Sequence, residues 1–405
     1  MLNKDLLLEA QNLQSELIQF RRYLHAHPEI GFDLSLTRSF VESQLSSMGY
    51  QPKDCGRSGI VVTMGNKKKD KTFLIRGDMD ALPIMEDTDL DFSSSNGYMH
   101  ACGHDMHTAM LLGAAKILKA HETEINGTIK LMFQPAEEIL EGAKDMIDAG
   151  VLHKPDVDAA LMIHVMSGVP FPAGTIIVSS AGPSAPAADY FRIFIKGKGC
   201  HGSTPNAGID PLNAASHILI AVQEIASREL SFSDKAVLTF GSIHGGTASN
   251  IIPDFATMSG SMRTYDEKLR TYIKQRLCEI ASGIASTFRC SADVTFSSSC
   301  PTLINDKSLC TSAEKYLKEL FDSDTVYSAA SLNAGSHSGS PSGSEDFAYV
   351  SQEVPSVMIA IAAGSPEDGY LYPLHHPKVN FDENVLHRGS ALYAYTAMRW
   401  LEEHS

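Results

Sequence analysis

The sequence has little of what marks a secreted protein or one that binds nucleic acid. Basic residues are in the minority: Lys and Arg number 33 against 48 Asp and Glu, which gives a formal charge of −15 at pH 7. Since nucleic acids and anionic membranes attract clustered positive charge, this balance argues against both as partners. The seven cysteines are an odd number without paired spacing, which favours reduced thiols in a cytoplasmic protein over a disulfide framework.

The chain also lacks a long apolar run. Near the amino terminus, Lys4, Asp5 and Glu9 interrupt the short leucine run 6–8. We therefore expect neither a signal peptide nor a membrane span, which needs about 20 apolar residues. At 405 residues the chain exceeds what one hydrophobic core usually holds, so two domains are expected.

One short segment concentrates residues that bind metal ions. Between His100 and His107 lie one thiol, three imidazoles and a carboxylate. Thiolate and imidazole suit borderline-soft divalent ions, and the spacing of Cys102 and His104 lets one loop place both on one ion. Apolar periodicity over about 106–120 predicts a helix that fixes the loop. Such a pair alone is more often a buried cysteine beside a hydrogen-bonded histidine, so further ligands are needed.

Further polar side chains follow three predicted buried strands. They are Asp80 after strand 72–75, Glu137 and Glu138 after strand 128–133, and His164 after strand 157–163. In open α/β sheets, ligands bind outside the carboxyl ends of the strands. We therefore expect these side chains to share one cleft.

The middle of the chain predicts a separate domain. Small residues and prolines from 179 to 186 look like a linker. Beyond it, the pattern predicts strand 189–196, helix 211–229, strands 235–242 and 255–264, helix 267–287 and strand 292–297. This βαββαβ order is the ferredoxin-like motif. We predict an α/β protein with a catalytic metal-binding domain over 1–182 and 299–405, interrupted by an inserted domain over 183–298.

The candidate residues suit a site for two metal ions. Two divalent ions about 3.5 to 4 Å apart need roughly five protein ligands and a base. The candidate ligands are Cys102, His104, Glu138, His164 and either His375 or His376. Glu137 is left as a general base that passes a proton from a metal-activated water to a leaving amine. Singly, Glu137 and Glu138 fit a helix N-terminal charge pair and His164 a core histidine, but their joint position at strand ends favours metal.

Longer strings resemble one enzyme family. They span residues 100–107, 134–138 and 343–347, with further matches over 22–29 and 76–83. The chain resembles the aminoacylase and hippurate hydrolase group of dinuclear metallopeptidases, which includes N-acyl-amino-acid amidohydrolases, N-acetyldiaminopimelate deacetylases and auxin-conjugate amidohydrolases. The resemblance covers nearly the whole chain. It implies a zinc-peptidase-like α/β/α catalytic domain in which the insertion is a lid and dimerisation domain.

The resemblance also implies roles for single residues. The implied metal ligands are Cys102, His104, Glu138, His164 and His375, the last chosen over His376 by the family pattern His-x-Pro. Glu137 would be the base, Asp80 would orient the site, His201 would reach the substrate carbonyl, Asn250 would hold substrate, and Arg263 would meet the substrate carboxylate. Two divalent ions per subunit (Zn, Mn, Co or Ni) and a homodimer are implied as well.

Three departures from the family pattern flank the cleft. Met106 and Cys200 stand where the group usually has glycine, and 139–141 replaces a smaller run. These positions bear on which acyl group fits and leave the ligand set intact.

The predicted function is therefore hydrolysis of N-acyl amino acids through attack by a metal-bridging water. The alternatives among enzymes are a dipeptidase or carboxypeptidase, or an N-acetyldiaminopimelate deacetylase. A binding protein that keeps only the fold is disfavoured by the intact ligands and by Glu137. A closed structural zinc site is a further alternative, which one metal ion per chain would favour.

Overall fold

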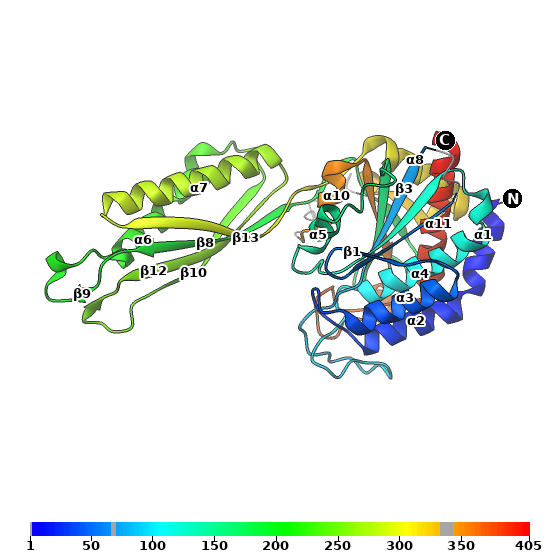
Figure 1. Ribbon diagram of the computed structural model, residues 1–405, viewed down its shortest axis with the longest axis horizontal. Helices are drawn as coiled ribbons and strands as arrows, with labels where there is room; N and C mark the ends of the chain where they lie inside the picture. Colours follow the sequence, from blue (N-terminus) through cyan, green and yellow to red (C-terminus); the bar gives the residue numbers. More distant parts are fainter. Residues whose placement is uncertain (1, 66–69, 333–342) are drawn as a thin grey trace. The chain divides into compact units, whose positions relative to one another are not determined.

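The computed structural model describes residues 2–65, 70–332 and 343–405. The chain forms two compact units (Figure 1). The first comprises Met1–Ser184, Ile304–Ser340 and Asp346–Ser405, and the second comprises Ala185–Leu303 and Pro341–Glu345. From the sequence we predicted that the chain crosses between the domains after residues 182 and 298. Short strands β7 (Gly182–Ala185) and β14 (Leu303–Asn305) pair where the chain passes between the units.

The first unit is built on one mixed eight-stranded sheet. In spatial order its strands are β1 (Lys53–Cys55), β2 (Gly59–Gly65), β4 (Thr128–Gln134), β3 (Thr72–Asp78), β5 (Ala159–Met166), β16 (Ser356–Ala362), β6 (Ile176–Val178) and β15 (Val326–Ser328). The central strands β4, β3, β5 and β16 are parallel. β3 and β4 are buried along their whole length, as expected of central parallel strands covered on both faces.

Helices cover both faces of this sheet (Figure 1). One face carries α4 (His104–Ala120), α11 (Leu386–His404) and α8 (Lys307–Leu320), with α1 (Leu2–Asn12), α2 (Gln14–Ala26) and α3 (Ser35–Ser47) beside them. The other face carries α5 (Gly142–Asp148) and α10 (Ala348–Glu353), and α9 (Ala329–Leu332) follows β15. The predicted α/β/α arrangement is therefore present. Within the described residues, no helix has the length and apolar composition needed to cross a bilayer.

The second unit is a four-stranded antiparallel sheet packed against two helices (Figure 1). Its strands lie in the order β10 (Ala236–Gly245), β12 (Phe255–Thr264), β8 (Ala187–Lys196) and β13 (Ser291–Cys300), and its helices are α6 (Pro211–Ala221) and α7 (Glu267–Thr287). Along the chain this is the predicted βαββαβ order. Asp210 and Asp266 cap the two helices by accepting hydrogen bonds from first-turn N–H groups. Buried and exposed residues alternate along β8, so one face packs on the helices and the other stays open.

Three predicted element boundaries are wrong. Apolar periodicity over about 6–24 predicts a single helix, but this helix is divided at Leu13, whose N–H is shared between the carbonyls of Glu9 and Ala10. The helix expected over 211–229 ends at Ala221 and is followed by a separate π-helical turn. His164 lies inside β5 and not after it, because pairing with β16 continues past this residue.

Candidate metal centre

The sheet and its loops bring the five candidate ligands into one cluster. Their ligand atoms form two groups, Cys102 with His104 and His164, and Cys102 with Glu138 and His375. Within each group the atoms lie within 4.8 Å of one another. Cys102 and His104 flank the start of α4, whereas the others come from the β4–α5 loop, β5 and the segment after β16. All these residues belong to the first unit, and four separate chain segments thus meet around one point.

Hydrogen bonds fix the orientation of two histidines toward that point. Nδ1 of His104 lies 2.8 Å from the carbonyl oxygen of Asp80, and Nδ1 of His164 lies 2.7 Å from that of Val165. A carbonyl only accepts hydrogen bonds, so both Nδ1 atoms carry a proton, and Nε2 is the atom of each ring that is left to bind a metal ion. Nε2 of His164 lies 3.6 Å from Cys102 Sγ.

Two atoms of the cluster are buried without a hydrogen-bond partner. They are Nε2 of His104 and Oε1 of Glu138, which lie 3.9 Å apart. A buried unpaired acceptor is costly, and such groups usually have a partner in a finished site. Both atoms are lone-pair donors that a divalent cation would bind. The residues present therefore fit the pair of metal ions that the sequence implies.

Negative charge accumulates around the cluster. Burial, together with the charges of Asp80 and Asp78, raises the pKa of Glu138 to about 7. Burial and the Glu138 carboxylate raise the pKa of the Cys102 thiol. Burial alone would lower the pKa of His104, but Asp78 and the hydrogen bond to Asp80 raise it. A cation at this position would offset the shared charge and favour the thiolate and the carboxylate.

Asp80 fixes the backbone that carries both glutamates. Its two carboxylate oxygens accept hydrogen bonds from the backbone N–H groups of Glu137 and Glu138, at 3.0 and 3.1 Å. The preceding Ala136 has φ +55, a left-handed conformation that is strained for alanine. The tight turn thereby places Glu137 and Glu138 together beside His104.

The structure brings His375 to the cluster and turns His376 elsewhere. Nε2 of His375 lies 3.6 Å from Oε1 of Glu138. The ring of His376 stacks on Tyr372, and its Nδ1 accepts a hydrogen bond from the Lys378 N–H. His375 has φ +64, so a strained backbone accompanies this ligand position as well.

A neighbouring group of metal-binding residue types is satisfied without a metal. Nδ1 of His107 lies 2.6 Å from Asp78, and Nε2 of the same ring accepts a hydrogen bond from the Val165 N–H at 2.8 Å. Both nitrogens are therefore used. The other oxygen of Asp78 pairs with Arg76 at 2.6 Å. His107 and Asp78 therefore lie beside His104, with Asp78 3.6 Å from its Nε2, and are not ligand candidates.

A buried ion network around Arg76 was not predicted from the sequence. Arg76 also pairs with Asp346 at 3.1 Å and donates to Gln134 at 2.8 Å. Asp346 in turn accepts from Gln134 and from the Ala143 N–H. These contacts join β3, β4 and the first turn of α5 to a segment 200 residues and more away, as the separations of Asp346 from Gln134, Arg76 and Ala143 show. The matching strings around 76 and 346 were the signal that could have revealed it.

A second buried network holds the residue after His104. Arg21 and His25 both contact Oδ2 of Asp105, at 2.8 and 2.7 Å, and the other ring nitrogen of His25 lies 3.1 Å from Glu86. All four side chains are at most 1% exposed. The network ties α2 to the first turn of α4 and so steadies the loop that carries Cys102.

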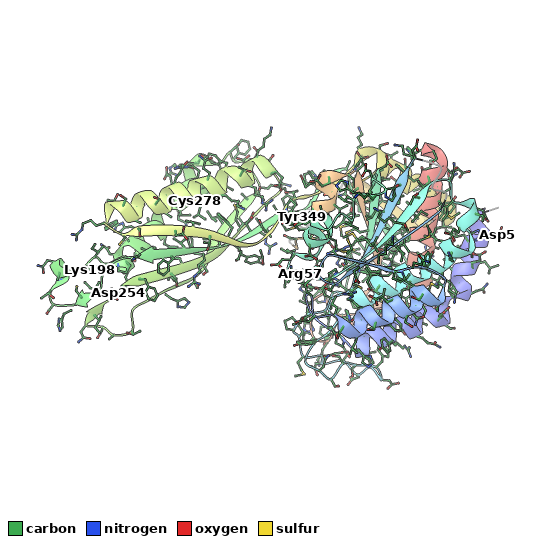
Figure 2. All side chains as sticks on the ribbon, viewed as in Figure 1. Asp5, Arg57, Lys198, Asp254, Cys278 and Tyr349 are labelled. Carbon is green, nitrogen blue, oxygen red and sulfur yellow. The ribbon has the colours of Figure 1, made fainter. Side chains whose placement is uncertain are left out.

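Three predicted site residues lie in the second unit, and their roles stay predictions. His201 is an exposed residue of β9 (Cys200–His201), which pairs with β11 (Ile251–Ile252). Its Nδ1 accepts from the N–H of Ser203 at 3.2 Å. Asn250 precedes β11 and is exposed, and Arg263 on β12 donates to Tyr190 and Ser344. Figure 2 shows the end of this unit that carries β9, with Lys198 and Asp254 labelled.

Comparison with known proteins identifies the family. Residues 74–399 match the model of peptidase family M20/M25/M40. The chain belongs to this family. It is 35% identical over 398 residues to thermostable carboxypeptidase 1 of Saccharolobus solfataricus, covering 97% of each chain. It is 34% identical over 401 residues to hippurate hydrolase of Campylobacter jejuni, covering 98% of this chain and 100% of that one.

A solved structure supports the same assignment. The Bacillus subtilis YXEP protein, a dinuclear metal-binding peptidase of the M20 family, matches with a TM-score of 0.78 and 31% identity, over 96% of this chain and 99% of that chain. The predicted family and α/β fold class are confirmed. The protein is a hydrolase of the M20 family, whose members include dinuclear metal-dependent peptidases and amidohydrolases.

Proposed function

We propose that this M20 hydrolase cleaves the amide bond of N-acyl amino acids and releases a carboxylic acid and a free amino acid. The observation that carries the proposal is the cluster of Cys102, His104, Glu138, His164 and His375, in which two lone-pair atoms are buried without a partner, with Glu137 alongside. The match to hippurate hydrolase over nearly the whole chain supports the same substrate class.

Glu137 is the residue that moves the proton in this proposal. When bound, the two divalent ions would lower the pKa of a water molecule and polarise the acyl carbonyl. Glu137 accepts a proton from the attacking water and delivers it to the nitrogen of the leaving amine. Asp80 holds the backbone of Glu137 and Glu138 in register, so the base and the ligand keep their separation. Thiolate and imidazole ligands favour zinc, cobalt or nickel over calcium, and the carboxylate of Glu138 is a ligand type that also suits manganese.

Residues of the second unit complete the proposed substrate site. Arg263 would bind the substrate carboxylate as a bidentate pair, Asn250 would hold the substrate, and His201 would donate a hydrogen bond to the developing oxyanion. We assign His201 to the site of a partner subunit. An edge strand supports pairing of subunits through this unit: among the strands of the described residues, β10 has a neighbour on one side only, and Val237 and Ile243 on it are exposed. The unpaired cysteines are the basis for proposing a cytoplasmic location.

The first test separates the base from the ligand. Glu137→Gln should keep both metal ions and lose about 10² to 10⁴ in turnover, whereas Glu138→Gln should also bind metal more weakly. Glu141→Gln is the matched control, because Glu141 lies on the same loop but pairs with Arg57 on the surface. Metal content by elemental analysis and turnover are measured for all three variants. One tightly held ion per wild-type chain, unchanged in excess metal, would contradict a dinuclear site.

The second test concerns the substrate. Acetyl-, benzoyl- and aminoacyl-amino acids are assayed side by side with protein loaded separately with zinc, manganese, cobalt and nickel. Preference for acetyl or benzoyl substrates supports the proposal. Preference for substrates with a free amine, as in a dipeptide, favours the carboxypeptidase or dipeptidase alternative, for which the Saccharolobus relative is the argument.

The third test addresses the partner subunit. A His201→Ala chain and a Glu137→Gln chain are co-expressed with different tags, and the heterodimer is purified. If His201 acts across the interface, the heterodimer has one complete site although each parent is nearly inactive, since an oxyanion donor typically contributes about 10² to 10³ in rate. A heterodimer no more active than its parents rejects the assignment.

A further inference from the structure

Arg388 in the first unit has a partly buried charge, and no carboxylate of the described residues lies within ion-pairing distance of it. The residue lies in the first turn of α11. Its Nη2 donates to Oγ1 of Thr325 at 3.0 Å, and the guanidinium carbon lies 4.5 Å from the ring centroid of Phe321. Within the described residues, Arg388 forms no ion pair within 4.0 Å. The remaining residues, 1, 66–69 and 333–342, include no Asp or Glu, so they supply no carboxylate either.

Two features make this cation unfavourable as it stands. Burial lowers the pKa of Arg388, and only the charge of the exposed Asp322 works against that shift. The guanidinium also sits at the amino-terminal end of α11, whose first turn has no acidic residue. The aligned peptide dipoles give that end partial positive charge. An anion beside Arg388 would relieve both effects.

A cavity of about 300 Å³ opens beside Arg388. Phe171, Pro172, Tyr327 and Leu332 give it an apolar lining. The volume is at the lower end of the range for small-molecule sites. None of its lining residues is among the candidate ligands or substrate-binding residues, so the cavity is distinct from the metal cluster.

The geometry leaves one nitrogen of Arg388 available to a ligand. Nη2 is committed to Thr325, and Nε is buried without an acceptor. Gly174 packs against Arg388, since a Cβ at this glycine would lie 3.1 Å from Arg388 Cδ and 3.2 Å from its Nε. Nη1 has no hydrogen-bond partner among the described residues, and it is not one of the buried atoms that lack a partner. Nη1 is therefore the nitrogen that donates to the carboxylate of a ligand.

We propose that this cavity binds a small organic carboxylate, with its carboxylate group on Arg388 and its apolar body against Phe171 and Tyr327. The apolar lining distinguishes such a ligand from inorganic phosphate. Asp324 also lines the cavity and is exposed, so a ligand that carries an ammonium group beside its carboxylate would find a partner there. Binding at this site does not depend on the proposed hydrolysis, although that reaction would release carboxylates of both kinds.

Calorimetric titration of the full chain with benzoate tests the proposal. Metal-loaded protein is titrated first, and the titration is repeated after chelation, because carboxylates can also bind at a metal centre. In both states we expect one saturable benzoate-binding site per chain, and binding at that site should depend on Arg388. The neutral isostere benzamide should bind at least about tenfold more weakly, since a charge-assisted contact is lost.

Variants assign the binding to Arg388. Arg388→Met should weaken benzoate at least about tenfold. Arg399→Met is the matched control, because Arg399 lies on the same helix but pairs with Glu402 and does not line the cavity, and it should leave benzoate binding unchanged. Thr325→Val keeps the charge and removes the acceptor that orients it, so a severalfold loss is expected. This variant and the benzamide comparison keep the test decisive even if Arg388→Met fails to fold.

Two further ligand pairs define the ligand class. Leucine and 4-methylpentanoate differ only in the ammonium group. Tighter binding of leucine indicates an amino-acid ligand that uses Asp324, and tighter binding of 4-methylpentanoate indicates a simple carboxylic acid. Either result supports the proposal. Four results overturn it: benzamide as tight as benzoate, inorganic phosphate as tight as benzoate, unchanged binding in Arg388→Met, or no saturable benzoate binding up to about 20 mM.

Discussion

Replacing Arg21 by methionine removes the permanent cation from the buried network beside the metal loop. Arg21 and Asp105 are both fully buried and 2.8 Å apart, and breaking such a pair from one side typically costs about 3 to 5 kcal/mol. Arg22 provides a matched control. Both arginines pair with Glu383, Arg21 at 3.2 Å and Arg22 at 2.7 Å. Because the Arg22 side chain is 48% exposed, Arg22→Met should cost at most about 1 kcal/mol.

The cost of Arg21→Met should depend on pH because His25 can take over part of the charge. Burial and Arg21 lower the pKa of His25, but Asp105 and Glu86 outweigh them, and the pKa is raised above 6.5. A raised folded-state pKa stabilises the protein fully below the unfolded-state value, and the contribution is lost as pH rises through the folded-state value. Without Arg21 the imidazolium is favoured further. The destabilisation should therefore be smaller near pH 6 than near pH 9.

Urea unfolding of chelated protein measures both effects. The chain has a single tryptophan, Trp400 on α11, so its fluorescence reports on the first unit alone. Equal unfolding free energies for Arg21→Met and Arg22→Met, or a difference that does not change between the two pH values, would refute the reasoning.

Three further outcomes are expected. Gly103→Ala should lower metal affinity at least about tenfold, measured by competition with a chelator, because Gly103 has φ +84 and a Cβ there would lie 2.3 Å from Val165. Tyr393→Phe should cost about 1 to 3 kcal/mol in urea unfolding, because its hydroxyl accepts from the Ile163 N–H and donates to a buried carbonyl. Glu86→Gln should destabilise the protein in a pH-dependent way. Burial alone would raise the pKa of the Glu86 carboxyl, but His25 and other hydrogen bonds lower it to about 2. The stability advantage of the wild type should therefore be complete above the ordinary pKa of 4.5 and shrink as pH falls toward 2, as urea unfolding at several pH values would show.

Local patterns were sufficient to predict the long elements. The apolar runs that became β3 and β4 are buried along their whole length, so their composition carried a clear signal. The helix 267–287 and the strand 255–264 were predicted with the observed bounds, since each has strong periodicity. The strands β6 and β15 were missed because three residues are too few to show a period.

Long-range partners were not predictable from local pattern. The break at Leu13 has no proline or glycine to mark it. Arg76 stands within a buried strand, and its partner Asp346 lies in a distant segment, so no spacing rule connects them. Likewise, Arg21 and Asp105 belong to helices whose packing alone brings the charges together. Positions at the carboxyl ends of the predicted strands indicated which side chains gather at the site. The hydrogen-bond partners of those side chains could be read only from the three-dimensional structure.

The position of β16 constrains how the protein can be made. This strand lies between β5 and β6 in the sheet, yet Ser356 pairs with Ala160 only after the whole second unit has intervened in sequence. A ribosome therefore releases β5 with an open hydrogen-bonding edge, which stays exposed to other chains until the last segment emerges. The second unit, whose elements are contiguous from β8 to β13, can fold in that interval. The catalytic unit is then completed after synthesis ends, so its yield in cells depends on protecting that edge.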